Sequence, residues 1–141
     1  LASADVPVGV AIAPVIPGLN DAEVAPLLER AAARGAGRAF MTLLRLPGEV
    51  EHVFTEQLRE AFPMRVDRVM AALSEMRDGK LGGSPFGERM QGRGARWQII
   101  EQVFQKTCAR LGMHAGEGPV PSAQAPGFRR PRPQLGLFDQ D

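Results

Sequence analysis

Cysteine is almost missing from this chain of 141 residues, because Cys108 is the only one. One thiol cannot form an internal disulfide, and it cannot build a metal site that needs several cysteines from the same chain. Histidine is also rare, and His52 and His114 are expected to be surface residues. We therefore expect no metal ligands in this chain, and Cys108 is expected to be a small buried side chain on a helix.

Long apolar runs and an excess of charge are also absent. No stretch approaches the roughly 20 apolar residues that cross a bilayer, and residues 1–18 lack the basic start of a signal peptide. We expect no membrane partner and a cytoplasmic location. The formal net charge is only +1, so the whole molecule has no strong field for nucleic acid, although Arg129, Arg130 and Arg132 gather near the C-terminus.

The first 48 residues have the pattern of a strand, a helix and a second strand. Residues 6–16 form a β-branched apolar run, which is typical of a strand buried on both faces in a parallel sheet. Turn residues follow, and Asn20 with Glu23 has the spacing of a helix capping box. Residues 38–46 predict a second buried strand. A βαβ unit with two parallel strands, within an α/β fold, is the expected result.

Helical periodicity begins at Glu49 and continues to about residue 112. Three helices are predicted: one ends before Pro63, one follows it and one covers residues 95–111. Their inward apolar stripes are expected to include Val50, Val53, Ile99 and Val103. Leu27 is expected to point inward from the earlier helix, which lies between the two predicted strands. Residues 113–141 are rich in proline and glycine and are expected to be a disordered tail. The predicted units are therefore 1–48, 49–112 and 113–141.

A turn at residues 14–21 carries a resemblance to a known family. The Gly-x-Ile-x-Gly-x-x-Glu pattern of radical S-adenosylmethionine (radical SAM) enzymes is matched by Ile16 and Gly18, whereas Pro14 and Asp21 replace the first glycine and the glutamate. LLRLPGEV follows one helix later, and FGERMQGRG precedes the last helix. In that order, the three segments resemble the spore photoproduct lyase-like radical SAM proteins over residues 1 to about 112.

The resemblance implies that the chain is the C-terminal portion of a partial (β/α)₆ barrel enzyme of DNA repair or DNA metabolism. Such enzymes bind a [4Fe-4S] cluster on a Cys-x3-Cys-x2-Cys loop and use S-adenosylmethionine to generate a 5′-deoxyadenosyl radical, in the lyases for carbon–carbon cleavage. This chain lacks those cysteines. We therefore expect the fragment alone to be inactive, and no catalytic residue is assigned.

The residues expected at the cofactor follow the two predicted strands, where a glycine permits close approach and a helix start offers N–H groups. They are Pro14, Ile16, Gly18, Asn20, Leu44 and Arg45. An ordinary strand–turn–helix explains the first four equally well. Arg45 lies in an apolar run, where a charge needs a partner; it would meet an anion, form a structural ion pair or point to solvent.

Residues 79–94 form a glycine-rich connection with basic residues at its end. Arg89, Arg93 and Arg96 recur at a spacing that one helical turn would align, and Phe86 and Met90 lie in the same segment. The segment could therefore hold a nucleic-acid phosphate. A solvated surface loop is the alternative.

The tail carries a second motif, QLGLF, near the C-terminus. Gln134, Leu135, Leu137 and Phe138 resemble the short peptide with which proteins bind the bacterial DNA sliding clamp. A fold-back latch on the domain is the other interpretation. The motif also defines an alternative function, a non-catalytic helical adaptor that binds the clamp. A helical domain with neither activity is the third possibility.

Overall fold

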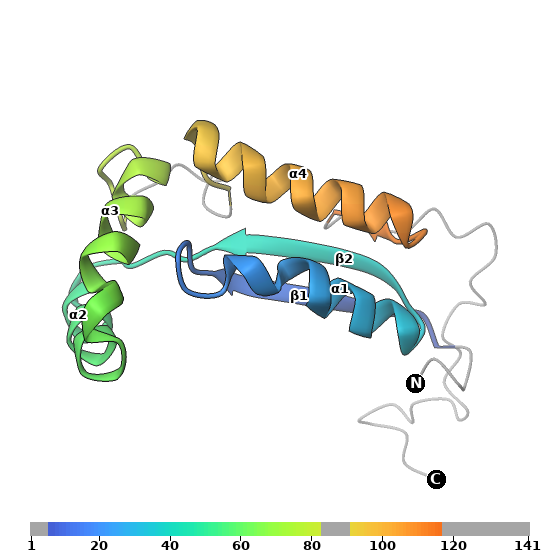
Figure 1. Cartoon of the computed structure of the whole chain (residues 1–141), viewed down its shortest axis with the longest axis horizontal. Helices are drawn as coiled ribbons and strands as arrows, with labels where there is room; N and C mark the ends of the chain where they lie inside the picture. Colours follow the sequence, from blue (N-terminus) through green and yellow to red (C-terminus); the bar gives the residue numbers. More distant parts are fainter. Residues whose placement is uncertain (1–5, 83–90, 117–141) are drawn as a thin grey trace, which may run out of the picture.

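The computed structural model describes residues 6–82 and 91–116, and Figure 1 shows their arrangement. Short 3-10 turns at Asp21–Glu23 and Pro63–Arg65 precede two of the helices. The elements in chain order are β1 (Val8–Val15), α1 (Val24–Ala33), β2 (Ala36–Leu43), α2 (Glu49–Ala61), α3 (Val66–Met76), α4 (Gly94–Arg110) and β3 (His114–Ala115).

The three strands form one parallel sheet in the order β1-β2-β3. The mixed α/β class and the two predicted parallel strands are confirmed, but β2 ends at Leu43, so Leu44 and Arg45 lie just beyond it. The third strand was not predicted. It lies inside the segment that we expected to be tail, where Met113 is buried and His114 pairs with Arg38 of β2.

One face of the sheet carries the hydrophobic core. Ile12 and Val15 of β1 join Leu28 of α1 and Phe104 of α4 in one buried cluster. The helices α1 and α4 lie alongside the sheet and contact each other (Figure 1). Apolar side chains at alternate strand positions therefore meet the helices, as a half-covered sheet requires.

The other face of β1 is exposed, which corrects the expectation that this strand is buried on both faces. Gly9, Ala11 and Ala13 alternate with the buried positions, and all three are exposed. Phe40 and Thr42 of β2 are half-buried on the same side, since Ala11 pairs with Phe40. Among the described residues, no helix covers this face. Nor does a described strand pair with the outer edge of β1.

The helices α2 and α3 lie beyond the carboxyl ends of the strands (Figure 1). Pro63 separates them as predicted, and Leu58, Val69 and Leu73 are buried. Several residues that were expected to point inward are instead exposed, because the apolar stripe of each helix is wider than the surface by which that helix packs against the core. They are Leu27, Val50, Val53, Ile99 and Val103.

Candidate functional site

The six predicted cofactor residues belong to the two segments that follow β1 and β2 at the carboxyl end of the sheet. Val15 and Leu43 are the last paired residues of β1 and β2, and the backbone N–H of Leu44 donates to the carbonyl of Val15 at 2.9 Å. Ile16 and Leu44 therefore leave neighbouring strands at the same level. Parallel strands place such ends in one crevice, where α/β proteins bind their ligands.

The turn after β1 is held by its own side chains. Asn20 Oδ1 accepts a hydrogen bond from the Ile16 N–H at 2.7 Å, and Asn20 Nδ2 donates to the Pro14 carbonyl at 3.1 Å. Asp21 Oδ1 accepts from the Gly18 N–H at 3.0 Å. The expected capping box is therefore wrong, since Asn20 reaches back to the turn and makes no side-chain cap bond to the helix. The turn N–H groups of Ile16 and Gly18 are engaged.

Gly18 is required by the shape of this turn. Its φ of +78° lies in the left-handed region that other residues rarely adopt. A side chain there would also meet Arg68 of α3, whose Cγ and Nε lie 3.7 Å from the position of a Cβ. Ile16 is half-buried and packs against the core, whereas Pro14 is exposed. The turn thus presents a fixed backbone with part of one apolar side chain.

Two arginines lie at the carboxyl end of β2. Arg77 is 6% exposed, and its guanidinium donates to the carbonyls of Leu43, at 2.9 Å, and Leu44, at 3.1 Å from Nη2. Arg45 is half-buried, and its Nε donates to the Gly82 carbonyl at 3.1 Å. Burial, followed by the nearby Arg45 charge, lowers the pKa of Arg77. Two cations therefore lie close together where β2 ends.

Arg77 is the residue that the sequence analysis missed. A signal was present, because Arg77 follows buried Leu73 by four positions and so continues the inward stripe of α3. A charge at such a position is costly unless it is hydrogen-bonded. The carbonyls at the end of β2 supply those bonds, from residues more than 30 positions earlier in the chain.

Of the basic cluster expected to align on one turn, two residues are described. Arg93 precedes α4 in extended backbone, and its side chain pairs with Asp78 at 3.0 Å. Arg96, in the first turn of α4, places Nε 3.4 Å from Glu75 Oε2 of α3. The two side chains therefore pair with different carboxylates. Phe86, Arg89 and Met90 lie outside the described residues, as do Gln134, Leu135, Leu137 and Phe138 of the tail.

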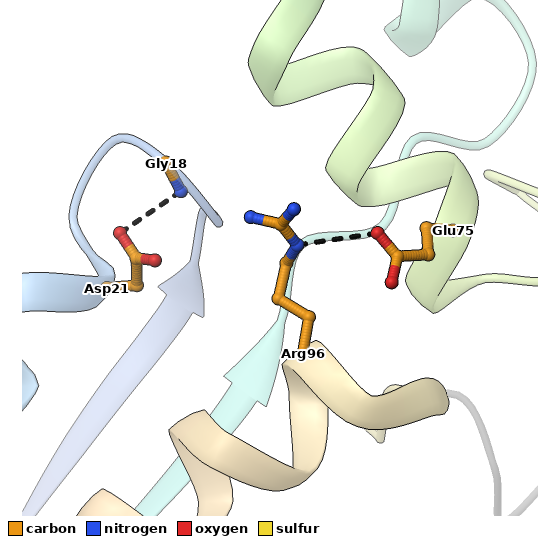
Figure 2. Close-up of polar contacts among 4 residues, drawn as sticks. All are labelled: Gly18, Asp21, Glu75 and Arg96. Atoms are coloured by element: carbon orange, nitrogen blue, oxygen red, sulfur yellow. Dashed lines mark hydrogen bonds and ion pairs between the residues drawn. The ribbon is translucent and has the colours of Figure 1, made fainter.

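Arg96 faces the turn after β1. Figure 2 shows its side chain rising from α4, with Nε at Glu75 and one terminal nitrogen of the guanidinium on the side of Gly18. The three elements that carry Gly18, Glu75 and Arg96 thus meet over the carboxyl end of the sheet.

The described residues offer no site for an iron–sulfur cluster. Cys108 is 1% exposed on α4, and desolvation by burial raises the pKa of its thiol, which disfavours the thiolate that ligates iron. His52 and His114 are exposed as expected, and no group of three potential ligands gathers anywhere in residues 6–82 and 91–116. Cysteine ligands for a cluster would have to come from outside these residues.

Comparison with protein-family models, with curated proteins and with solved structures gave no match to this chain. Within the described part of the chain, no helix has the length and apolar character needed to cross a membrane.

Proposed function

We propose that this chain is the C-terminal portion of a radical SAM enzyme resembling the spore photoproduct lyase-like proteins, acting in DNA repair or DNA metabolism. Its sheet would continue from β1 into a partial (β/α)₆ barrel, in which the loop after the first strand carries the cluster cysteines. Cysteines outside the described residues would hold the cluster, which in such enzymes would supply the electron for radical formation from S-adenosylmethionine. No residue described here ligates that cluster, and no catalytic residue is assigned.

The observation that carries this proposal is the uncovered face of β1. The sequence of this strand is typical of burial on both faces, yet Ala11 and Ala13 are exposed, and at Gly9 the side chain of Arg38 from β2 lies over the backbone. Apolar residues on an open face, beside an unpaired strand edge, favour further pairing. The preceding strand of a partial barrel would pair with this edge, and the curvature of the sheet would turn these small side chains toward the barrel interior.

The carboxyl end of the sheet supports the same proposal. In this hypothesis the fixed turn of Pro14, Ile16, Gly18 and Asn20 lies against the cofactor's adenosyl part, with Leu44 and Arg45 beside it. The half-buried Ile16 offers an apolar surface, and the positive φ of Gly18 keeps the backbone close. Because the N–H groups of Ile16 and Gly18 and the carbonyls of Pro14 and Ile16 are already bonded within the turn, recognition would rest on the shape of the turn.

The test begins with the reading frame upstream of Leu1 and the protein that it encodes. We expect an in-frame segment with Cys-x3-Cys-x2-Cys, and a protein that takes up a [4Fe-4S] cluster under anaerobic reconstitution, measured by iron content and absorbance. Ala11→Lys should abolish a folded, cluster-loaded protein, because it places a charge inside the barrel. Ala33→Lys, on the exposed end of α1, is the matched control and should load normally.

A longer protein that binds no iron, or one in which Ala11→Lys loads as well as Ala33→Lys, would refute the barrel. In the 141-residue chain itself, both substitutions lie on exposed positions and should change the free energy of unfolding by less than about 0.5 kcal/mol. This comparison separates a burial effect from an intrinsic effect of lysine.

The tail motif favours a second function, binding to the DNA sliding clamp. Leu137 and Phe138 would fill an apolar pocket while Gln134 makes hydrogen bonds, as peptide anchors do. The double variant Leu137→Ala/Phe138→Ala should weaken binding to purified clamp roughly 100-fold or more, since it removes two anchors. Gly136→Ser, at the variable middle position, should bind like the unaltered chain in the same titration. Equal binding by all three chains would exclude the motif.

A further inference from the structure

The helix α2 carries an apolar stripe on its exposed side. Val50 and Val53 are 50% and 57% exposed, and Ala61 is exposed as well. These three residues lie on one side of a helix with 3.6 residues per turn, and we call them the α2 stripe. The helix packs mainly against α3 and the 3-10 turn that joins the two, and it lies at one end of the molecule (Figure 1). An exposed apolar stripe with a polar border is typical of a docking surface.

A row of glutamates borders the α2 stripe. Glu49, Glu56 and Glu60 are exposed and are separated by seven and four positions, so they align along α2 on the side of Val53. We call them the glutamate row. Among the described residues, no lysine or arginine forms an ion pair with the row, and Glu56 lies 3.6 Å from His52. With His52 counted as neutral, the four glutamates and one arginine of α2 give it a formal net charge of −3.

Neither helix stability nor a neighbouring arginine accounts for the glutamate row. Glu49 lies in the first turn of α2, where a negative charge is favourable, but Glu60 lies in the last turn, where it is not. Arg65 lies over the Phe62 ring, with Cζ 5.9 Å from the ring centroid, and Arg68 lies against the turn after β1. Both arginines keep their charges, but neither forms an ion pair with the row. The row therefore remains available to a cationic ligand.

Charge distinguishes the α2 stripe from an exposed apolar pair on α4. Ile99 and Val103 are 63% and 41% exposed. The residues three or seven positions away on the same side of α4 are basic, namely Arg96, Lys106 and Arg110. A ligand that combines arginines with apolar side chains therefore fits α2 better than α4. A second copy of the chain fits α2 poorly, because two such helices would bring their glutamates together.

Residues 129–138 of this chain have the chemistry that fits the α2 stripe. The segment reads RRPRPQLGLF, with three arginines and no acidic residue, and its apolar side chains are Leu135, Leu137 and Phe138. We propose that this segment docks on α2, with its arginines along the glutamate row and its three apolar side chains on the α2 stripe. The segment lies outside the described residues. Two aspartates follow it, so the complementary charge belongs to its arginine end.

The connecting chain is long enough for this contact. The Gly116 N–H donates to the Ala39 carbonyl at 2.9 Å. Ala39 precedes Glu49 by ten residues, so these two residues lie at most about 36 Å apart. Residues 117–128 alone can span about 40 Å when extended. Exposed ion pairs contribute little individually, but an effective concentration of about 1 mM within one chain allows a contact with a Kd of about 100 µM to be mostly formed.

Docking on α2 requires neither an iron–sulfur cluster nor the sliding clamp, so it does not rest on the proposed function. It would occupy Leu137 and Phe138, however, and a clamp contact would use the same side chains as anchors. The two contacts would therefore exclude each other.

Amide NMR spectra of the ¹⁵N-labelled 141-residue chain test this contact. The double variant Leu137→Ala/Phe138→Ala should shift the amide signals of the α2 stripe and leave those of Ile99 and Val103 in place, because it releases the segment from α2. Gly136→Ser should leave both sets of signals unchanged. Salt at about 1 M, where the Debye length is about 3 Å, should move the signals of the α2 stripe in the same direction as the double variant, because it screens the ion pairs.

A matched pair of charge reversals tests the glutamate row. Glu49 and Glu51 both lie in the first turn of α2 and are both exposed, but Glu51 lies on a different side of the helix from the row. Glu49→Lys should weaken docking roughly fivefold, because it replaces an attraction by a repulsion. Glu51→Lys should leave docking unchanged at physiological salt. The signals of core residues in the same spectra identify any variant that is not folded.

Signals of the α2 stripe that do not respond to the double variant would overturn the proposal, as would equal effects of Glu49→Lys and Glu51→Lys. Shifts on α4 in place of α2 would assign the segment to another surface. Shifts of the α2 stripe that weaken on dilution would assign the stripe to a second copy of the chain, because docking within one chain is independent of concentration. None of these measurements needs a cluster or a clamp, so their failure and that of the proposed function are distinguishable.

Discussion

Replacing Arg77 by methionine should lower the free energy of unfolding by about 2–4 kcal/mol. The guanidinium is 6% exposed and donates to the carbonyls of Leu43 and Leu44, where β2 ends. Methionine fills much of the same space but donates nothing. The carbonyls then lose their donors in a place that water reaches poorly, and each such loss costs about 1–3 kcal/mol.

A smaller effect opposes this loss of stability. Removing Arg77 also removes the electrostatic repulsion between Arg77 and Arg45, and this stabilises the folded variant. Arg45 is only half-buried, however, and solvent screens the interaction. The lost hydrogen bonds should therefore decide the sign.

Urea unfolding followed by circular dichroism measures this difference. Arg59→Met is the matched control, because Arg59 is exposed on α2 and should change stability by less than about 0.5 kcal/mol. Arg77→Lys keeps the charge but cannot reproduce the planar fork of donors, so an intermediate loss is expected. A loss under about 1 kcal/mol for Arg77→Met would mean that these bonds contribute little.

Local patterns predicted the elements but not which faces are covered. The apolar run of β1 and the break at Pro63 both act within a few residues, so their outcomes could be predicted. Whether Ala11 and Ala13 are covered depends on segments far away in the chain or outside it. A run of small apolar residues carries no information on that point.

Contacts that a short sequence pattern does not encode explain the other predictions that were wrong or absent. The strand β3 is two residues long and forms because α4 returns the chain to the edge of β2, so no periodicity could reveal it. The direction of the Asn20 side chain was set by the Ile16 N–H and the Pro14 carbonyl rather than by the helix. The prediction that the two strand ends are neighbours is confirmed, because β1 and β2 are adjacent parallel strands whose last paired residues are Val15 and Leu43. The role of the six cofactor candidates remains a proposal.

Gly92 is the second position where a small change should have a large effect. A Cβ at Gly92 would lie 2.7 Å from Cδ2 of the Trp97 ring and 2.9 Å from Cδ2 of Leu43. Both neighbours are almost fully buried, at 4% and 2% exposed, so neither can move away freely. Gly92→Ala should therefore destabilise the chain by about 1–3 kcal/mol, the usual cost of overpacking a core.

The backbone of Gly92 is not in the left-handed region, so the penalty is steric and can be isolated. Gly37→Ala is the control, because nothing lies within 4 Å of its Cβ position. That substitution should be neutral or stabilise by up to about 1 kcal/mol, since alanine reduces the freedom of the unfolded chain. In a double-mutant cycle, Trp97→Phe should relieve part of the Gly92→Ala penalty, because the smaller ring leaves room for the methyl group. Additive effects, or a Gly92→Ala variant as stable as Gly37→Ala, would show that Trp97 does not pack closely against the glycine that leads into α4.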